Sequence, residues 1–257
     1  MAPKFEAFKT LHNTDHLFVL PNAWDAQSAI ILQEINYPAV GTSSAAVAAS
    51  LGYADGEVMP FADYLMIIKR IAASVSVPVT IDMEMGYGKT PGAVYTNVLK
   101  LLDAGIAGIN IEDSIITNGK RTLKDAEELA QTVGYIKDKL TNTHQSLFIN
   151  VRCDTYLLNV NDKENETTRR LPLYESAGAD GIFLPFISNE KDISRAVSET
   201  KLPLNVMAMP GLPDIGKLDE LGVKRVSMGP FLQMKTYSHA RELAQQVRDQ
   251  NSLKSIL

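Results

Sequence analysis

The sequence lacks the features that mark several large classes of protein. Cys153 is its single cysteine, which excludes an intrachain disulfide and fits a reducing cytoplasm. No run of about 18 apolar residues occurs, so no segment is expected to cross a membrane. The first residues are mixed polar and lack the apolar stretch of a signal peptide. We therefore expect a cytoplasmic protein with no membrane partner.

Charge of one sign is not concentrated anywhere along the 257 residues. The net charge is −5 and no block of like charges is present, which argues against a nucleic-acid partner. Hydrophobic residues make up 45% and charged residues 21% of the chain, as in a globular protein with a large core.

Short apolar runs alternate with longer amphipathic segments from end to end. The eight runs are HLFVLPNAW, PAVGTSS, PVTIDMEMG, AGINIED, LFINVRCDT, DGIFLPF, PLNVMAMPG and KRVSMGP. Their composition suits parallel strands covered on both faces. Three predicted helices are each followed by a strand within a few residues. Gly105, Gly178 and Gly222 lie just past the ends of these helices, where a left-handed cap is needed. Eight such units predict a single (β/α)8 TIM barrel domain over residues 1–257, with a doubly wound open sheet as the alternative.

Polar residues gather where these predicted strands end. In both architectures the ligand lies beyond the carboxyl ends of the strands. The polar residues there are Asn22, Asp25, Thr42, Ser43, Ser44, Asp82, Glu84, Glu112, Asp113, Asn150, Arg152, Asp154, Asn205 and Ser227. The first halves of the strands are nearly free of charge, so this polarity indicates a functional site.

Three carboxylates stand out in that set. Asp82 and Glu84 are two residues apart on one strand and so share a face, and Glu112 comes from the neighbouring strand. Carboxylates this close repel one another unless a proton or a cation neutralises them. Oxygen ligands without His or Cys favour Mg²⁺ or Mn²⁺. The pattern predicts a metal site, and the alternative is that these acids form salt bridges to helix residues.

Arg152 is the cation expected at the mouth of the barrel. Its planar fork suits a carboxylate or a phosphonate, and the alternative is a structural ion pair with Glu112 or Asp154. Cys153 alternates with Arg152 along the strand, so we expect it to face the helix layer as a packed core residue.

The GTSS segment ends the second predicted strand. Its hydroxyls and backbone N–H groups could hold a substrate carboxylate or a developing enolate oxygen. The alternative is a turn of small residues between a strand and a helix.

Taken together, these segments resemble the isocitrate lyase/phosphoenolpyruvate mutase superfamily, and in particular its short phosphoenolpyruvate-mutase-like branch. The motifs that carry the resemblance are NAWDAQSA, GTSS, DMEMGYG, GINIEDS, NVRCDTYL, GADGIFLP, LPLNVMAMPG and RVSMGP. The resemblance implies a (β/α)8 barrel, usually a homotetramer whose C-terminal helix is exchanged between subunits. It also implies Mg²⁺ and a small anionic 2-oxo acid or enolpyruvate ligand.

The resemblance implies roles for individual residues as well. Asp82 would approach the metal most directly, Glu84 and Glu112 would hold its waters, and Asp55 would lie near the same site. The expected catalytic residues are Asp55, Arg152 and Ser43. The expected substrate-binding residues are Trp24, Ser43, Ser44, Ala45, Asp82 and Arg152.

The region after the fourth strand departs from the superfamily pattern. The lyases carry a K-[KR]-C-G-H motif there, but residues 114–123 contain neither Cys nor His. The mutases have a longer lid with a Lys and an Asn, for which Lys120 and Asn118 are loose candidates. A histidine of the mutases' sixth strand is replaced by Pro185.

We therefore expect a Mg²⁺-dependent enzyme that cleaves or rearranges a C–C or P–C bond of a small 2-oxo acid, such as oxaloacetate or phosphonopyruvate. The reaction would pass through a metal-bound pyruvate enolate. A lyase or decarboxylase is favoured over a phosphonomutase-type isomerase or a phosphonopyruvate hydrolase, because the lid lacks the mutase pattern. A barrel that binds a 2-oxo acid without turning it over stays open as an alternative. A metal aldolase of another barrel family would need a Lys or His at a strand end, and the sequence shows neither there.

Overall fold

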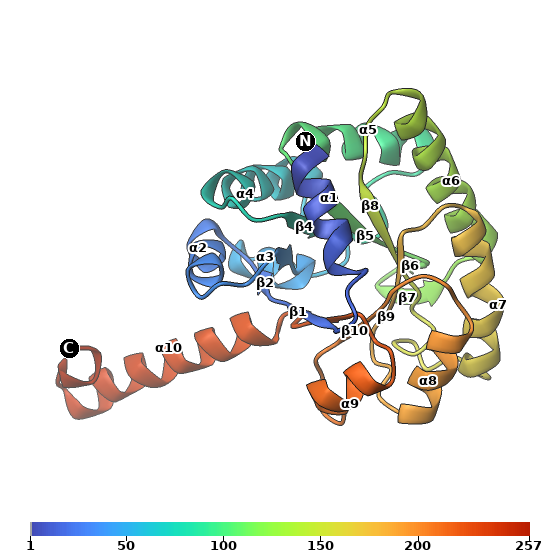
Figure 1. Ribbon diagram of the computed structural model, residues 1–257. Helices are drawn as coiled ribbons and strands as arrows, with labels where there is room; N and C mark the ends of the chain where they lie inside the picture. The colour runs from blue at the N-terminus through green and yellow to red at the C-terminus, as the bar shows by residue number, and fades with distance from the viewer. Residues whose placement is uncertain (1) are drawn as a thin grey trace.

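The computed structural model describes residues 2–257, and its centre is a parallel sheet rolled into a barrel (Figure 1). The strand order is β1-β11-β10-β9-β8-β5-β4-β3-β2. β1 (Phe18–Leu20) and β2 (Asn22–Ala23) are consecutive pieces of one extended segment, interrupted at Pro21, which has no N–H to donate. Because β1 pairs with β11 and β2 with β3, the two ends of the order meet. The predicted (β/α)8 barrel is confirmed.

The remaining elements follow the expected alternation of strand and helix. The other barrel strands are β3 (Val40–Thr42), β4 (Val79–Asp82), β5 (Gly108–Glu112), β8 (Phe148–Arg152), β9 (Gly181–Leu184), β10 (Leu204–Met207) and β11 (Arg225–Ser227). The helices are α1 (Ala2–Leu11), α2 (Ala26–Glu34), α3 (Ser44–Ser50), α4 (Phe61–Ser74), α5 (Pro91–Asp103), α6 (Ala126–Asn142), α7 (Lys163–Ser176), α8 (Glu190–Ser198), α9 (Ile215–Glu220), α10 (Phe231–Gln250) and a 3₁₀ turn at Lys254–Ile256. A separate hairpin is formed by β6 (Ser114–Thr117) and β7 (Lys120–Leu123).

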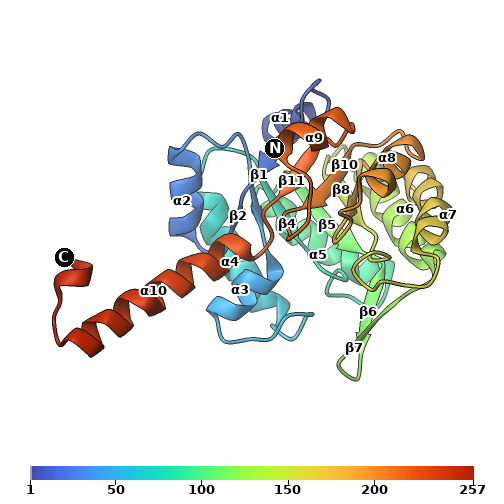
Figure 2. The same cartoon turned by 90° about the horizontal axis from the view of Figure 1, so that it is seen from below.

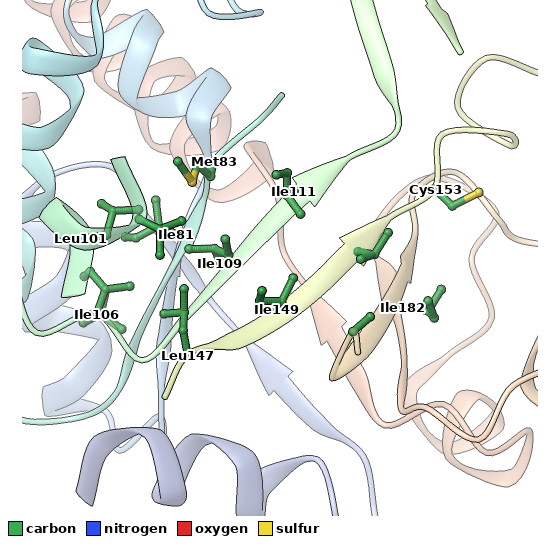
Figure 3. Packing of buried hydrophobic residues seen from close by; sticks show 14 of the residues in the cluster. Ile81, Met83, Leu101, Ile106, Ile109, Ile111, Leu147, Ile149, Cys153 and Ile182 are labelled. Atoms are coloured by element: carbon green, nitrogen blue, oxygen red, sulfur yellow. The ribbon is translucent and has the colours of Figure 1, made fainter. Parts of the chain in front are cut away.

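The main core lies between the sheet and its ring of helices. Alternate residues of each strand point outward into it, among them Ile81, Ile109 and Ile149 (Figure 3). Cys153 is buried in the same layer, as the alternation along β8 predicts. The residues between them on each strand point into the barrel, and those near the carboxyl ends of β4 and β8, Asp82 and Arg152, line the cavity described below.

The N-terminal end of the barrel is closed by α1. Phe8 of this helix is fully buried and packs with Leu20 of β1, Ala39 just before β3 and Phe148 at the start of β8. His12, just after the helix, stacks on Phe148 with ring centroids 4.2 Å apart. The barrel is therefore open at one end only, the end that holds the polar residues.

Two residues at predicted element boundaries have structural roles. Thr90 caps α5, where its hydroxyl accepts a hydrogen bond from the N–H of Ala93 at 3.2 Å, as its place before Pro91 predicts. Asp25 caps α2 in the same way, accepting from the N–H of Ser28 at 2.7 Å. Asp25 thus belongs to a helix terminus and not to the strand-end cavity.

The last long helix, α10, projects away from the barrel and is followed by the 3₁₀ turn near the C-terminus (Figure 2). Met234 and Tyr237 on α10, and Leu253 and Ile256 beyond it, are exposed apolar or aromatic side chains. No helix within residues 2–257 has the length and apolarity to cross a membrane.

Candidate active site

A cavity of about 390 Å³ lies at the carboxyl ends of the barrel strands. Polar side chains that sequence analysis collected line it from β2, β3, β4, β8 and β11 and from the segment that follows β3. The residues predicted for the site that line the cavity are Ser43, Ser44, Ala45, Asp55, Asp82 and Arg152. These segments lie far apart in the chain, and the barrel brings them into one pocket.

Asp82 is held rigidly at the end of β4. Its N–H donates to Thr42 Oγ1 at 3.2 Å, and its carbonyl accepts from the Tyr64 hydroxyl at 2.8 Å. Thr42 and Tyr64 are in contact at 3.0 Å, so the three groups form one hydrogen-bonded chain. This clamp fixes the backbone where strand pairing ends, and the Asp82 side chain therefore has a defined position.

The Asp82 carboxyl has one bound and one bare oxygen. Oδ2 accepts from the Ser44 hydroxyl at 2.9 Å, whereas Oδ1 is buried and has no hydrogen-bond partner among the described residues. Burial raises the pKa of Asp82, against the opposing effect of the Arg152 charge. A buried oxygen of this kind calls for a ligand, a cation or a water.

Glu84 lies just beyond β4, with a left-handed backbone (φ 49°). Its carboxylate accepts from the N–H of Glu57 at 2.7 Å and from the Tyr87 hydroxyl at 3.1 Å. Burial, followed by the charge of Asp82, raises the pKa of Glu84 to about 8. Glu84 therefore braces the loop behind Asp82 and is not one of the cavity-lining residues.

Glu112 is fully buried at the end of β5 and lies between two arginines. Its Oε2 is 2.8 Å from Nη1 of Arg152, and its Oε1 forms a close ion pair with Arg121. The contact with Arg152 is an ion pair without hydrogen-bond alignment. The ion-pair alternative stated for the acids thus describes Glu112, although its partners are on a strand and in the hairpin and not on a helix.

Arg152 also grips a second carboxylate. Its Nε and Nη2 donate to the two oxygens of Asp154 at 2.6 and 3.2 Å. Burial opposes the charge of Arg152, but Asp154 and Asp82 outweigh it and raise the pKa of Arg152. Arg152 is thus paired with Glu112 and Asp154, as the structural alternative predicts, and it also lines the cavity, where its binding of an anion stays a prediction.

Arg121 is the site residue that sequence analysis missed. It comes from the hairpin, is only 16% exposed and lines the cavity. Besides Glu112 it contacts the Ser114 hydroxyl at 2.8 Å, and it lies 3.6 Å from Asp154 and 3.9 Å from Asp55. The cavity therefore contains two guanidinium groups.

The hairpin that carries Arg121 turns at Asn118 and Gly119, which both have positive φ. This Asn-Gly pair is the strongest short-range signal for a two-residue hairpin, and it could have revealed the hairpin in the sequence. Asn118 and Lys120 are exposed near the tip and do not line the cavity. Ile116 of the hairpin packs against Gly56, and a Cβ atom at Gly56 would lie 2.2 Å from Cδ1 of Ile116. The hairpin therefore fits closely over the loop that holds Asp55.

Several predicted residues lie outside the cavity. Trp24 is buried edge-on against Tyr237 of α10, with ring centroids 6.3 Å apart. Asp113 accepts from Arg170 at 2.9 Å and from the Tyr174 hydroxyl at 2.7 Å, and so ties β5 to α7. Asn150 and Asn205 are buried inside the barrel below the cavity floor.

The acidic residues do not form a ready-made cage for a metal ion. Within residues 2–257, no three His, Cys, Asp or Glu side chains are arranged to hold one directly. The bare oxygen of Asp82 nevertheless fits Mg²⁺, which commonly keeps several waters and takes one or two protein carboxylates. The donor set thus fits a hydrated Mg²⁺ at Asp82, with Glu84 and Glu112 behind it.

Comparison with known proteins agrees with this architecture. The family model for phosphoenolpyruvate phosphomutase matches residues 8–248. An uncharacterized protein of Mycobacterium tuberculosis is 34% identical over 87% of this chain and 81% of its own length. An oxaloacetate decarboxylase of Ectopseudomonas mendocina is 29% identical over 87% of this chain and 77% of its own. A crystal structure from Burkholderia cenocepacia, assigned provisionally as a phosphonomutase, has a TM-score of 0.89 at 32% identity, covering 95% and 99% of the two chains.

The chain belongs to the phosphoenolpyruvate phosphomutase family, within the isocitrate lyase/phosphoenolpyruvate mutase superfamily. Relatives with a named activity include the oxaloacetate decarboxylase and a 2-methylisocitrate lyase of Bacillus subtilis, 26% identical over 77% of this chain and 64% of its own length, which supports an enzyme of the lyase or mutase class.

Proposed function

We propose that this protein is a Mg²⁺-dependent lyase that breaks a C–C bond of a small 2-oxo diacid, with oxaloacetate as the first candidate. The observation that carries the proposal is the bare, buried Oδ1 of Asp82 in a cavity that also contains Arg152 and Arg121. One side of the cavity offers a site for a dication and the other offers two sites for an anion. A ligand with a 2-oxo acid at one end and an acidic group at the other fits both.

Asp82 would hold the metal, with Mn²⁺ able to replace Mg²⁺ because both prefer oxygen ligands. When bound, the dication would act as a Lewis acid toward the oxo and carboxylate oxygens of the ligand. Glu84 and Glu112 would accept hydrogen bonds from its waters. Ser44 would hold the Asp82 carboxylate in place through the 2.9 Å hydrogen bond.

Arg152 would anchor the end of the substrate that leaves. Its guanidinium has five N–H groups, of which two donate to Asp154, while Nη1 is ion-paired with Glu112 without a hydrogen bond. Two of the remaining N–H groups would serve the ligand, enough for a bidentate grip on a carboxylate. In decarboxylation the C–C bond to that carboxylate breaks, CO₂ leaves, the electron pair moves toward the 2-oxo group, and the carbon then takes a proton to give pyruvate.

Ser43 and Ala45 would contact the oxo acid end, and Asp55 would lie at the rim beside Arg121. Ser43 already caps α3 by accepting from the N–H of Ala46 at 3.3 Å, so its hydroxyl proton remains free to donate to the ligand. Asp55 is half exposed, and it is placed to order water at the cavity mouth.

A second candidate reaction is phosphonomutase or phosphonopyruvate hydrolase chemistry. The provisional assignment of the Burkholderia structure favours it, and a phosphonate would suit the two arginines as well as a carboxylate does. Within residues 2–257, neither Asn118 nor Lys120 of the hairpin lines the cavity. We therefore rank this reaction second.

The test is a turnover screen of 2-oxo acids and phosphonates with Mg²⁺, in which pyruvate release is measured. We expect pyruvate from oxaloacetate or a close diacid, above the rate in a blank with Mg²⁺ alone. Turnover confined to phosphonopyruvate would favour the second candidate. Tight binding of oxalate without turnover of any acid would identify a binding protein.

We also propose that residues 1–257 act as one domain and that the protein is a homotetramer with α10 exchanged between subunits. The exposed Met234 and Tyr237 on the projecting helix support this, because such side chains are buried in stable assemblies. Light scattering of the purified protein should give about four times the mass of the 28.2 kDa chain. A monomer would refute it.

A further inference from the structure

A buried arginine lies inside the barrel, below the cavity floor. TIM barrel interiors are filled mainly with branched apolar side chains, but here Arg225 on β11 points inward and is fully buried. Its neighbours in the barrel include Asn110 on β5 and Asn150 on β8, which are also buried and polar. A buried cation is costly unless it is paired, so this arrangement needs an explanation.

The two hydrogen-bonding partners of Arg225 are neutral. Nη1 lies 3.4 Å from Nε2 of His12, and Nη2 donates to Oδ1 of Asn110 at 3.0 Å. Nδ1 of His12 lies 2.9 Å from the carbonyl of Phe8 and therefore carries the proton, which leaves Nε2 as an acceptor for Arg225. Burial lowers the pKa of Arg225 to about 9, with the charge of Asp82 acting against it. The guanidinium therefore stays charged at pH 7, without a carboxylate in contact.

The hydrogen bonds of Asn110 fix which way its amide points. Oδ1 accepts from Arg225, and it also accepts from Nδ2 of Asn150 at 2.9 Å. Because both donors bind the oxygen, the oxygen of the Asn110 amide faces away from the cavity and its NH₂ group faces the cavity. Within residues 2–257, Nδ2 of Asn110 has no acceptor, and Asn110 lines the cavity. On the sheet, Asn110 is paired in register with Asp82 on one side and with Asn150 on the other.

We propose that Arg225 is a positioning residue: together with Asn150 it locks the Asn110 amide so that its NH₂ group donates to an anionic oxygen of the ligand at the cavity floor. This inference rests on the proposed function for the nature of the ligand, a small 2-oxo acid or its enolate. The donor is preorganised, so binding costs no reorientation of the amide. The buried positive charge adds a field of the right sign beneath the anion.

The arrangement predicts an unusual pair of effects for Asn110→Asp. The new carboxylate gives Arg225 the counter-charge it lacks and still accepts from Asn150, so the melting temperature should be equal to or higher than that of wild type. The other carboxylate oxygen replaces the donor at the floor. Binding of oxalate in the presence of Mg²⁺, measured by calorimetry, should weaken at least about tenfold, the effect of losing one charge-assisted hydrogen bond.

Further variants distinguish the loss of the Asn110 donor from the effects of an added charge and of misfolding. Asn110→Leu removes the donor without a new charge and should also weaken oxalate binding several-fold. Arg225→Met should weaken it as well, and Arg225→Lys, which keeps a donor for Asn110, should restore most of the affinity. Thr80→Val is the matched control, because Thr80 is a buried residue on β4 whose hydroxyl has no partner within residues 2–257, and its affinity should match wild type.

The orientation itself is tested without any ligand. Neutron diffraction from crystals grown in D₂O should show the deuterons of Asn110 Nδ2 facing the cavity. The opposite orientation, or oxalate affinity unchanged in both Asn110 variants, would overturn the proposal. If wild type fails to bind oxalate, the proposed function is refuted, and the neutron map alone then decides whether Arg225 positions the amide.

Discussion

Arg152→Lys separates a role in anion binding from a purely structural one. Two N–H groups of Arg152 donate to Asp154 and Nη1 is ion-paired with Glu112, so we expect two N–H groups to serve the ligand. A lysine has three N–H groups, so after pairing with both carboxylates it keeps one for the anion. The variant thus loses one charge-assisted hydrogen bond, worth about 1.5–3 kcal/mol. In kcat/KM this corresponds to a loss of roughly 10- to 150-fold, at about 1.4 kcal/mol for each factor of ten.

The assay is pyruvate release from oxaloacetate with Mg²⁺, corrected for the spontaneous reaction. The fold should survive, because Glu112 keeps Arg121 and Asp154 keeps the hydrogen bond from Ser114 at 2.6 Å. Arg169→Lys is the control: Arg169 pairs with Glu166 on the surface and is 47% exposed, so its loss should leave kcat/KM unchanged. Unchanged kinetics in Arg152→Lys, with a normal melting curve, would show that Arg152 serves only to pair the acids.

Three further predictions follow from the same residues. EDTA should abolish turnover, Mg²⁺ or Mn²⁺ should restore it, and Asp82→Ala should not be rescued by either ion; full activity in EDTA would contradict the metal site. Burial and then the Arg225 charge lower the pKa of His12 from 6.5 to about 3. As the pH drops below 6.5, His12 is therefore protonated in the unfolded chain before it is protonated in the folded protein. The free energy of unfolding should fall by up to about 1.4 kcal/mol per pH unit. His12→Gln should flatten that slope in urea titrations between pH 6.5 and 4.5, and an equal slope in both proteins would refute it. Isocitrate and 2-methylisocitrate should not be cleaved, and Cys153→Ala should keep full activity, because the hairpin has no thiol and Cys153 is buried away from the cavity; release of glyoxylate or pyruvate from either acid would contradict this.

The barrel could be predicted from the sequence because two features of the sequence indicate its strands. The apolar runs are bounded by turn residues, and four of the strands change from apolar to polar toward their carboxyl ends, at Thr42, Asp82, Glu112 and Arg152. All eight runs contain a barrel strand in the structure. The role of α1 was not predicted, since the contact of Phe8 with Phe148 joins residues that no local pattern links.

The site was predictable where strand alternation alone decides which way a side chain points. Asp82 and Arg152 line the cavity for this reason. Glu84 differs because the strand ends at Asp82 and Glu84 has a left-handed backbone, so the period of two no longer applies. Arg121 and Arg225 were not predicted, because the Asn118-Gly119 turn marks the hairpin but not which of its side chains reaches the cavity, and the barrel closure that buries Arg225 is not visible in the residues next to it.

The charges of the cavity explain why a dication and an anion should bind together. Asp55, Asp82, Glu112 and Asp154 bring four carboxylates, and within residues 2–257 the cations that line the cavity are Arg121 and Arg152. With all six groups ionised, two negative charges remain uncompensated, and an anionic substrate alone would be repelled. A dication at the bare oxygen of Asp82 would neutralise the set and leave the free N–H groups of Arg152 as the strongest remaining attraction for a carboxylate. The acids that suggest a metal centre in the sequence are therefore partly counter-ions for the arginines. The metal depends on the carboxylate charge that the arginines do not neutralise, and the substrate depends on the N–H groups of Arg152 that the acids do not occupy.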